Sequence, residues 1–218
     1  MALEAHTTEV SIPVVGGALY GDWSVPAAPA GVVVFAHGSG SSRFSRRNQL
    51  VAAVLQQVGF ATLLMDLLTP AEEDVDRVTR GFRFDIPLLA DRVVASIDWL
   101  RDDEVFRPGR VGLFGASTGA AAALVAAAQR PSAVGAVVSR GGRPDLAGPA
   151  LRRVRAPTLL IVGERDRTVL ALNQQARAEM SAPVELDVVA GATHLFEEPG
   201  ALERVATLAR DHFTAWLV

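Results

Sequence analysis

Short apolar runs alternate with longer amphipathic stretches along most of the chain. The runs are rich in Val, Leu and Ile, and near-continuous apolar content of this kind is typical of parallel strands that helices cover on both faces. We expect these buried strands at residues 31–36, 60–66, 110–114, 134–139, 158–162 and 184–189.

Between the runs, apolar residues recur at three- and four-residue spacing, which predicts amphipathic helices. The helices are expected at residues 49–58, 86–101, 119–129, 169–180 and 201–217. Strands that alternate with helices in this order predict an α/β fold with a mostly parallel central sheet and helices on both faces. Without an internal repeat or a low-complexity linker, residues 1–218 are expected to form a single domain.

Two regions depart from this alternation. Residues 8–14 and 18–24 alternate apolar and polar positions around Gly16 and Gly17, which predicts a hairpin that adds an antiparallel edge to the sheet. Residues 69–85 are polar, carry five acidic residues and interrupt the pattern between a strand and a helix. This segment is the candidate for a short lid, with a solvated surface loop as the alternative. We expect no large cap domain.

Composition narrows the chemistry. The chain has 24 acidic and 21 basic residues, a formal charge of −3, no cysteine, and arginine at every basic position. Disulfides, thiolate metal ligands, a thiol nucleophile, a Schiff-base lysine and the lysine of a P-loop are therefore excluded. The charge balance is not typical of proteins that bind nucleic acids or membrane surfaces.

The beginning of the chain does not resemble a secretory signal. Residues 1–10 contain Glu4 and Glu9 and lack a basic cluster followed by an apolar run. The longest strongly apolar helical stretch, residues 120–128, is far shorter than the roughly 20 residues that a membrane span requires. We therefore expect a cytoplasmic protein.

Residues 115–119 read Gly-Ala-Ser-Thr-Gly and connect an apolar strand to an alanine-rich helix. A strand-to-helix turn of this kind is so tight that only small residues fit two positions either side of its centre, and it lifts the central hydroxyl clear of the sheet. The pattern predicts Ser117 as a nucleophile. The alternative is a chance match or a close contact between strand and helix.

Two later loops supply partners for this serine in the order serine, acid, histidine that α/β-hydrolases use. Asp166 follows the strand at 158–162, and His194 follows the strand at 184–189. Glu164 and Asp145 are the competing acids. The other histidines, His6, His37 and His212, have structural or surface roles as the default; they lie in the first segment, a glycine-rich loop and the last helix.

These three residue types suit acyl transfer. A serine hydroxyl is a weak nucleophile, so a base has to take its proton during attack and return a proton to the leaving alcohol. The imidazole of His194 can do both, and the carboxylate of Asp166 would fix its tautomer and stabilise the imidazolium.

A glycine-rich loop at residues 37–42 follows the strand at 31–36 and would face the nucleophile. We expect the backbone N–H groups of Ser39 and Thr118 to hold the developing oxyanion, and His37 to brace the loop. A phosphate cradle is the alternative, but Arg43 stands where a dinucleotide fingerprint has glycine. No pair of histidines has helical metal-ligand spacing, which favours catalysis without a metal or cofactor.

Arginines gather in two places, at residues 43–47 and at residues 140–143. Arg43 and Arg140 are candidates for binding a substrate carboxylate or phosphate through paired hydrogen bonds. Solvated arginines that pair with nearby acids are the alternative.

With these motifs in place, the chain resembles the dienelactone hydrolase-like branch of the α/β-hydrolases. The resemblance covers nearly the whole chain and rests on residues 37–43, 113–119 and 191–196. It implies a compact fold with an open pocket and an acyl-enzyme intermediate. Dienelactone hydrolase itself uses a cysteine nucleophile, whereas this chain has Ser117, which favours ordinary ester hydrolysis.

The sequence therefore predicts a serine hydrolase that cleaves small or short-acyl carboxylic esters, as a monomer or a homodimer. Lactone or thioester hydrolysis, acyl transfer and perhydrolysis remain open because they share the acyl-enzyme. A ligand-binding protein that keeps the pocket but turns over slowly, or not at all, is the alternative from another class.

Overall fold

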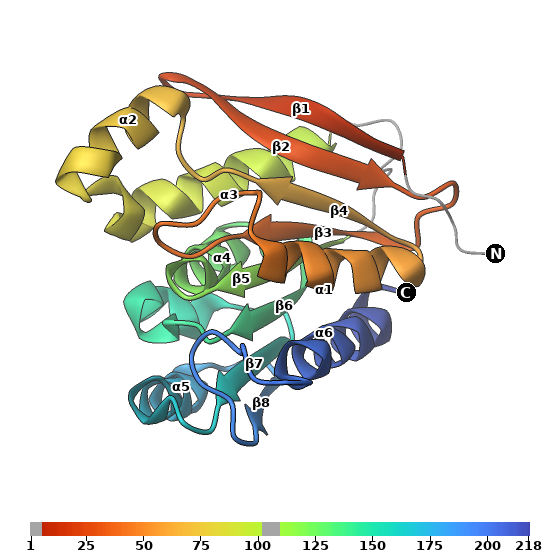
Figure 1. Cartoon of the computed structure of the whole chain (residues 1–218), viewed down its shortest axis with the longest axis vertical. Helices are drawn as coiled ribbons and strands as arrows, with labels where there is room; N and C mark the ends of the chain where they lie inside the picture. The colour runs from red at the N-terminus through yellow and green to blue at the C-terminus, as the bar shows by residue number, and fades with distance from the viewer. Residues whose placement is uncertain (1–5, 102–109) are drawn as a thin grey trace.

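The computed structural model of the protein describes residues 6–101 and 110–218 and is built on one eight-stranded sheet (Figure 1). The strand order is β1-β2-β4-β3-β5-β6-β7-β8, and all neighbours from β4 to β8 are parallel. The α/β-hydrolase fold predicted from the sequence is confirmed. The strands are β1 (His6–Val14), β2 (Gly17–Val25), β3 (Gly31–Ala36), β4 (Phe60–Met65), β5 (Val111–Ala116), β6 (Val134–Arg140), β7 (Thr158–Gly163) and β8 (Val184–Val189).

The first two strands form the antiparallel edge expected from their alternating pattern. β1 pairs with β2 from His6 opposite Val25 to Val14 opposite Gly17, and β2 in turn runs antiparallel to β4. Gly16 and Gly17 have φ angles of 87° and 153°, which residues with a side chain rarely adopt. The hairpin turn therefore depends on this pair of glycines.

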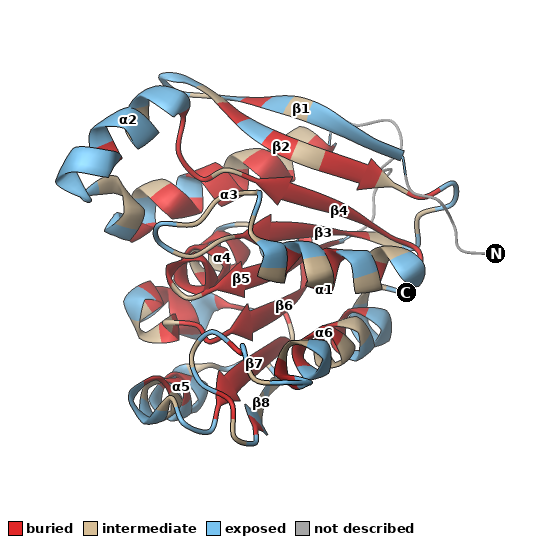
Figure 2. Ribbon diagram, viewed as in Figure 1, coloured by how far each residue is buried: buried red, intermediate tan, exposed pale blue. Residues whose placement is uncertain are grey.

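Helices cover both faces of the sheet, and the parallel strands β3 to β7 between them are buried, whereas the edge strand β8 is partly exposed (Figure 2). On one face, α1 and α6 pack over a cluster that includes Phe35, Phe114 and Phe213. On the other face, α3 and α4 pack over the larger cluster, and α5 lies beside η2. The helices are α1 (Arg46–Gln57), α2 (Pro70–Thr79), α3 (Ile86–Arg101), α4 (Thr118–Gln129), α5 (Arg167–Glu179) and α6 (Ala201–Leu217), with 3-10 helices η1 (Phe82–Phe84) and η2 (Pro144–Arg153). Within the described residues, no helix has both the length and the apolar content that crossing a membrane requires.

The polar segment after β4 is more ordered than its sequence pattern indicated. It contains the helix α2, which starts with a capping box: the Thr69 hydroxyl accepts the Glu72 N–H at 3.3 Å, and the Glu72 carboxylate accepts the Thr69 N–H at 2.8 Å. Pro70 in the first turn supports the same start. Apolar periodicity could not reveal this helix, because its only buried residue is Asp76.

The other differences are small. α1 begins at Arg46, earlier than the predicted residue 49, because the Ser45 hydroxyl caps it by accepting the Asn48 N–H at 3.4 Å. The 3-10 helix η2 was not predicted; Gly148 and Pro149 interrupt it, so it has no regular period to recognise. α3 and α6 have the predicted bounds.

Candidate active site

The nucleophile turn lies between β5 and α4. Ser117 has φ 50° and ψ −119°, a left-handed conformation that is strained for a residue with a side chain. A Cβ on Gly115 would collide with the backbone of Ala120, and one on Gly119 would collide with the carbonyl oxygens of Ala36 and His37. Both glycines are therefore required, and the strained turn holds Ser117 at the carboxyl edge of the parallel strands.

The histidine and the acid meet at the same edge. The Nδ1 of His194, which follows β8, lies 2.6 Å from Oδ2 of Asp166, at the start of α5. Asp166 is largely buried, with 15% of its side chain exposed, whereas the His194 side chain is 40% exposed. With Nδ1–H donating to the carboxylate, Nε2 is left to accept a proton.

The loops that carry this pair are tied together by a backbone hydrogen bond and by the side chain of Glu164. The Arg165 N–H donates to the Ala192 carbonyl at 2.9 Å, and the Gly191 N–H donates to the Glu164 carboxylate at 2.7 Å. Glu164, the competing acid, therefore holds the histidine loop in place, and the carboxylate that contacts the imidazole is that of Asp166.

The other candidate acid, Asp145, and the histidines His212 and His6 contact other residues or lie on the surface. Asp145 forms a two-point ion pair with Arg143, at 2.9 and 2.7 Å. His212 is buried on α6 and its Nε2 lies 3.2 Å from the Pro157 carbonyl, while His6 is exposed on β1.

The nucleophile and histidine loops approach each other through β6. The Ser117 N–H donates to the Arg140 carbonyl at 3.3 Å. A Cβ on the next residue, Gly141, would lie 3.5 Å from Cε1 of His194. Across residues 6–101 and 110–218, no hydrogen bond links the Ser117 hydroxyl to His194. The structure thus brings the three side chains to one rim, with the serine hydroxyl not yet bonded to the imidazole.

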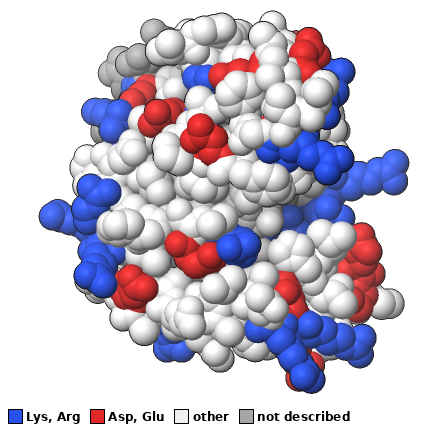
Figure 3. All heavy atoms as spheres, turned by 90° about the vertical axis from the view of Figure 1, so that its left-hand side faces the viewer, with Lys and Arg blue, Asp and Glu red and all other residues white. Residues whose placement is uncertain are grey.

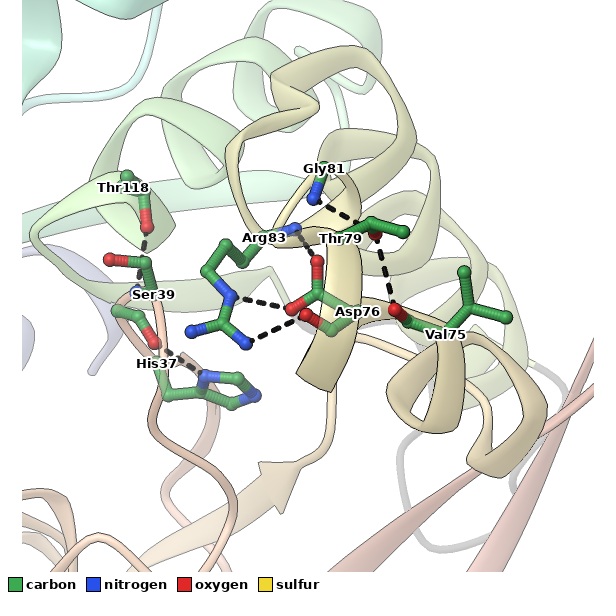
Figure 4. A network of polar contacts seen from close by, with 9 residues as sticks. His37, Ser39, Val75, Asp76, Thr79, Gly81, Arg83 and Thr118 are labelled. Atoms are coloured by element: carbon green, nitrogen blue, oxygen red, sulfur yellow. Dashed lines mark hydrogen bonds and ion pairs between the residues drawn. The ribbon is translucent and has the colours of Figure 1, made fainter.

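The glycine-rich loop after β3 lies directly against the nucleophile. A Cβ on Gly38 would be 3.1 Å from Cβ of Ser117. The Ser39 N–H donates to Oγ1 of Thr118 at 2.9 Å, so the expected oxyanion donors are neighbours (Figure 4). The Thr118 N–H belongs to the first turn of α4, where amides have no partner within the helix. The Ser39 N–H, in contrast, is already engaged by a side chain.

His37 braces this loop, as the sequence suggested. Its Nε2 accepts the Leu67 N–H at 3.2 Å, so its Nδ1–H must donate to the Gly38 carbonyl at 2.9 Å. Both bonds require a neutral ring. Burial lowers the pKa of His37, more than the Gly38 carbonyl bond and the nearby charge of Asp66 raise it. His37 is therefore a structural, uncharged residue.

The candidate lid lies beside this loop. Arg83 of η1 bonds through Nε to Oδ2 of Asp76 at 2.6 Å and through Nη2 to the Asp76 carbonyl at 3.1 Å. Asp76 is almost completely buried, and Nη1 of Arg83 faces Gly40 of the loop, where a Cβ would be 3.4 Å away. A small cavity lies between the two segments, lined by residues that include His37, Ser39, Leu67, Asp76, Arg83 and Thr118.

Arg43 does not point toward the nucleophile. Its guanidinium lies 2.6 Å from Glu9, 3.8 Å from Asp22 and 3.6 Å from Asp66, and its side chain is only 11% exposed. Its N–H also donates to Asp66 at 2.9 Å. The geometry favours the ion-pair alternative for Arg43, because these carboxylates hold it against the antiparallel edge of the sheet.

Arg140, unlike Arg43, has no carboxylate partner among the residues that the structure describes. It is the last residue of β6, only 7% exposed, and its Nε, like that of Arg43, is buried without a hydrogen-bond partner in the described part of the chain. Burial, and then the charge of Arg47, lower its pKa to about 10. Of the two candidate arginines, only Arg140 lies next to the nucleophile turn.

Sequence reasoning missed several residues that shape this site. Asp76 and Arg83 lie in the polar segment after β4, where a buried ion pair gives no periodic signal. Asn173 on α5 is fully buried and donates to the Gly142 carbonyl at 3.0 Å, which fixes the loop after β6. A lone buried asparagine in a helix has no local sequence signature.

Comparison with known proteins identifies close relatives. Residues 17–217 match the model of the dienelactone hydrolase family. A dienelactone hydrolase from Anabaena variabilis is 53% identical, with a TM-score of 0.96 over 99% of this chain and 100% of that chain. Est1E from Butyrivibrio proteoclasticus shares the fold at 15% identity, with a TM-score of 0.79 over 95% of this chain and 98% of that one.

Two Mycobacterium tuberculosis proteins are also similar. Each is 60% identical over 193 residues and carries the name "putative phosphoribosyl transferase". The match covers 88% of this chain but only 43% of each relative. The chain thus spans less than half the length of these curated relatives.

Proposed function

Because the chain belongs to the dienelactone hydrolase family, we propose that it hydrolyses carboxylic esters with Ser117 as the nucleophile. The observation that carries this proposal is the 2.6 Å contact between His194 and Asp166 at the rim where the strained Ser117 turn lies. Family membership supports a hydrolase; the serine mechanism and the ester substrate are our inference from these three residues.

In the first step, the Ser117 hydroxyl attacks the ester carbonyl while Nε2 of His194 takes its proton. Asp166 keeps Nδ1 protonated and stabilises the imidazolium that forms. The His194 side chain is 40% exposed, and catalytic hydrogen bonds often form or shorten only when substrate binds.

The oxygen of the tetrahedral intermediate would be held by the N–H groups of Thr118 and Ser39. Each such donor typically contributes about 3 kcal/mol to transition-state stabilisation. The hydroxyl of Thr118 accepts the Ser39 N–H at 2.9 Å and so keeps this amide next to the nucleophile before substrate arrives. The Ser39 N–H has to turn from this hydroxyl toward the substrate oxygen.

The acyl-enzyme then forms and is hydrolysed. His194 gives its proton to the leaving alcohol, the C–O bond of the ester breaks, and the acyl group stays on Ser117. Water attacks this acyl group with His194 again as the base, which releases the acid and restores the serine. Lactones, thioesters and acceptors other than water are compatible with the same intermediate.

Apolar side chains on the segments around the site suit small acyl or alcohol groups. Phe44, Phe84, Leu146 and Leu195 are between 39% and 59% exposed. They lie after β3, β4, β6 and β8, whose carboxyl ends share one edge of the sheet. We therefore propose short-acyl esters as the substrate class.

The names of the mycobacterial relatives concern longer proteins. This chain matches 43% of their length, and we propose ester hydrolysis for the matched part, with no claim about the rest. A pocket that binds a ligand without turnover is the rival reading, and it requires that Ser117 be unreactive.

The test combines turnover with labelling. Nitrophenyl esters of increasing acyl length should be hydrolysed, with the shortest favoured, and a fluorophosphonate probe should label the protein. Both signals should disappear in Ser117→Ala and persist in Ser181→Ala, where the replaced serine is exposed. Full activity in Ser117→Ala would reject the nucleophile, and an unlabelled, inactive wild type would support the binding-protein alternative.

A further inference from the structure

The segment that follows β6 holds the backbone of Ser117 from both sides. The Ser117 N–H donates to the Arg140 carbonyl at 3.3 Å, and the Ser117 carbonyl accepts the Arg143 N–H at 3.1 Å. The same carbonyl accepts the Ala120 N–H at 3.1 Å, from the first turn of α4. We call residues 140–143 the clasp, because this segment bonds both backbone polar groups of the nucleophile.

The first hydrogen bond of the clasp leads on to β7. The peptide group that carries the Arg140 carbonyl also carries the Gly141 N–H, which donates to the Ile161 carbonyl at 2.8 Å. Only backbone atoms take part, so this connection does not depend on the side chains at these positions. It ties the nucleophile to the strand that leads into the Asp166 loop.

The second hydrogen bond of the clasp leads on to α5 and depends on one side chain. The peptide group that carries the Arg143 N–H also carries the Gly142 carbonyl, which accepts a hydrogen bond from Nδ2 of Asn173 at 3.0 Å. Nδ2 also donates to the Val169 carbonyl at 2.8 Å, so the amide nitrogen has to face these two acceptors. Asn173 is therefore the side-chain link in the connection between Ser117 and α5.

This link is closed to solvent. Figure 3 faces the edge at which the parallel strands end, and acidic and basic side chains are mixed across the surface there. Gly142 and Asn173 are not part of that surface, because both are buried, Asn173 completely. A Cβ on Gly142 would collide with the Ser139 hydroxyl and with Cβ of Ala120. Water therefore does not compete for the bond, and the low local dielectric strengthens it.

Packing alone does not explain an asparagine at position 173. Its Oδ1 is buried and has no hydrogen-bond partner among the residues that the structure describes. A buried polar atom without a partner lowers stability, and an apolar side chain of similar size would avoid this loss. The Gly142 carbonyl is the group outside its own helix that Asn173 bonds. The asparagine is thus best explained by this bond.

The helix α5 carries the acid as well as the link. Asp166 caps the start of α5, and Asn173 follows two helical turns later, so both lie on the same face of the helix. Asp166 in turn contacts Nδ1 of His194 at 2.6 Å. The position of α5 therefore sets where the acid and the base stand, and the clasp sets where the nucleophile stands relative to α5.

We propose that Asn173 is a positioning residue that acts through the clasp and keeps Ser117 aligned with the acid–histidine pair. Without its amide, the Gly142 carbonyl loses its donor, the clasp loosens, and α5 shifts relative to the nucleophile. The contact of Gly119 with the end of β3 does not involve Asn173, so the oxyanion side keeps its place. The effect on catalysis rests on the proposed function, but the effect on the clasp does not.

The first test measures the clasp without catalysis. Amide hydrogen exchange, followed by NMR, reports on the Arg143 N–H, and its rate is expressed relative to that of the Val137 N–H, a buried strand amide that reports on global unfolding. Asn173→Leu roughly keeps the volume of the side chain but removes the donor. The relative rate should rise about 10-fold, the size expected for one lost hydrogen bond. Asn173→Ala removes the same donor with a smaller side chain and should give the same direction.

Ala176→Gly is the matched control. Ala176 is buried on α5, close to Asn173. Glycine at this position weakens the helix but leaves the amide of Asn173 in place. The relative exchange rate of the Arg143 N–H should therefore not rise in this variant.

The second test measures catalysis with a short-chain nitrophenyl ester. Asn173→Leu and Asn173→Ala should both lower kcat roughly 10- to 100-fold and leave KM nearly unchanged, because the serine and its base are misaligned while the substrate contacts remain. The rate of labelling by a fluorophosphonate probe should fall with kcat. Ala176→Gly should keep the kcat of the wild type. A role in stability alone would lower the fraction of folded enzyme without this selective loss of kcat.

Two results would overturn the positioning role. One is a relative exchange rate of the Arg143 N–H that neither Asn173 variant raises; the other is a kcat in these variants as high as that of Ala176→Gly. If Asn173→Leu does not fold, the alanine variant decides. If the wild type hydrolyses no ester but the relative exchange rate rises in the Asn173 variants, the clasp stands and the ester hydrolase proposal fails.

Discussion

The loops that carry Asp166 and His194 are joined mainly through their backbones, whereas the loop that carries Ser39 is held in place by side chains. On the acid–histidine side, the Arg165 N–H meets the Ala192 carbonyl, and the Glu164 carboxylate accepts a backbone N–H. On the oxyanion side, the supports are the neutral ring of His37, the hydroxyl of Thr118 and the ion pair beside Gly40.

This difference determines how each side should respond to change. Backbone bonds persist when side chains are replaced, so on the acid–histidine side the group that does the chemistry should matter most, and supporting side chains such as Glu164 less. On the oxyanion side the supporting side chains matter too, and so does their protonation. Four predictions follow, in order of decreasing effect.

Asp166→Asn should have the largest effect. An amide at this position cannot hold His194 in the tautomer that leaves Nε2 free, and kcat/KM for a nitrophenyl ester should fall about 10⁴-fold with little change in unfolding free energy. Glu164→Gln is the matched control and should cost far less activity, because its carboxylate bonds a backbone N–H. Equal losses in the two variants would reverse the assignment of the acid.

Asp76→Ala should mainly lower the free energy of unfolding, with a smaller direct effect on catalysis. The Asp76 side chain is 1% exposed and that of Arg83 is 20% exposed, so the variant leaves a largely buried guanidinium unpaired. Breaking such a pair typically costs about 3–5 kcal/mol, which urea unfolding would measure. The double variant Asp76→Leu/Arg83→Met removes both charges and should recover most of the loss. A double variant as unstable as the single one would show that packing, not the ion pair, holds this segment.

Thr118→Val should reduce kcat with little change in KM. It keeps the shape of the side chain but removes the acceptor of the Ser39 N–H, so the amide is no longer held beside the nucleophile. We expect a loss of roughly 10- to 100-fold, less than for complete removal of an oxyanion donor. Thr118→Ser keeps the hydroxyl and should retain most of the activity. Wild-type kcat in the valine variant would show that the hydroxyl does not position this amide.

Stability should decrease gradually at acidic pH through His37. Its folded pKa lies below the unfolded value of about 6.5, so the unfolded chain binds protons more readily. The contribution of this histidine to stability is therefore complete above that value and is lost as the pH falls toward the folded pKa. His212 also has a pKa lowered by burial, and His212→Gln removes its share. The free energy of unfolding of His212→Gln should still decrease as the pH falls. A free energy of unfolding that stays constant between pH 7 and pH 5 would contradict the role of His37 as a neutral structural residue.

Local patterns were enough to predict the sheet and the three candidate catalytic residues. Most of the parallel strands are apolar runs; Ser117 comes directly after β5, Asp166 three residues after β7 and His194 five residues after β8. Because the carboxyl ends of parallel strands share one edge, their order along the chain already placed these residues together.

Features that depend on distant residues could not be predicted in this way. Arg43 and Arg140 look alike in the sequence, and only the sheet topology brings Glu9 and Asp22 to Arg43 and, among the described residues, no acid to Arg140. The Ser39–Thr118 bond joins two segments that are far apart in the chain. The helix α2 was not predicted because almost all of its residues are exposed, although the capping box at Thr69 is a sequence signal for a helix start.

Gly119 has a consequence for how such a site can diversify. Not even a methyl group fits between Gly119 at the start of α4 and the end of β3, so the backbones of these two elements are in contact. No exchange of side chains can move the serine hydroxyl away from the facing amides or closer to them. New substrate preferences have to arise in the surrounding segments, above all α2, while the reacting core is inherited unchanged.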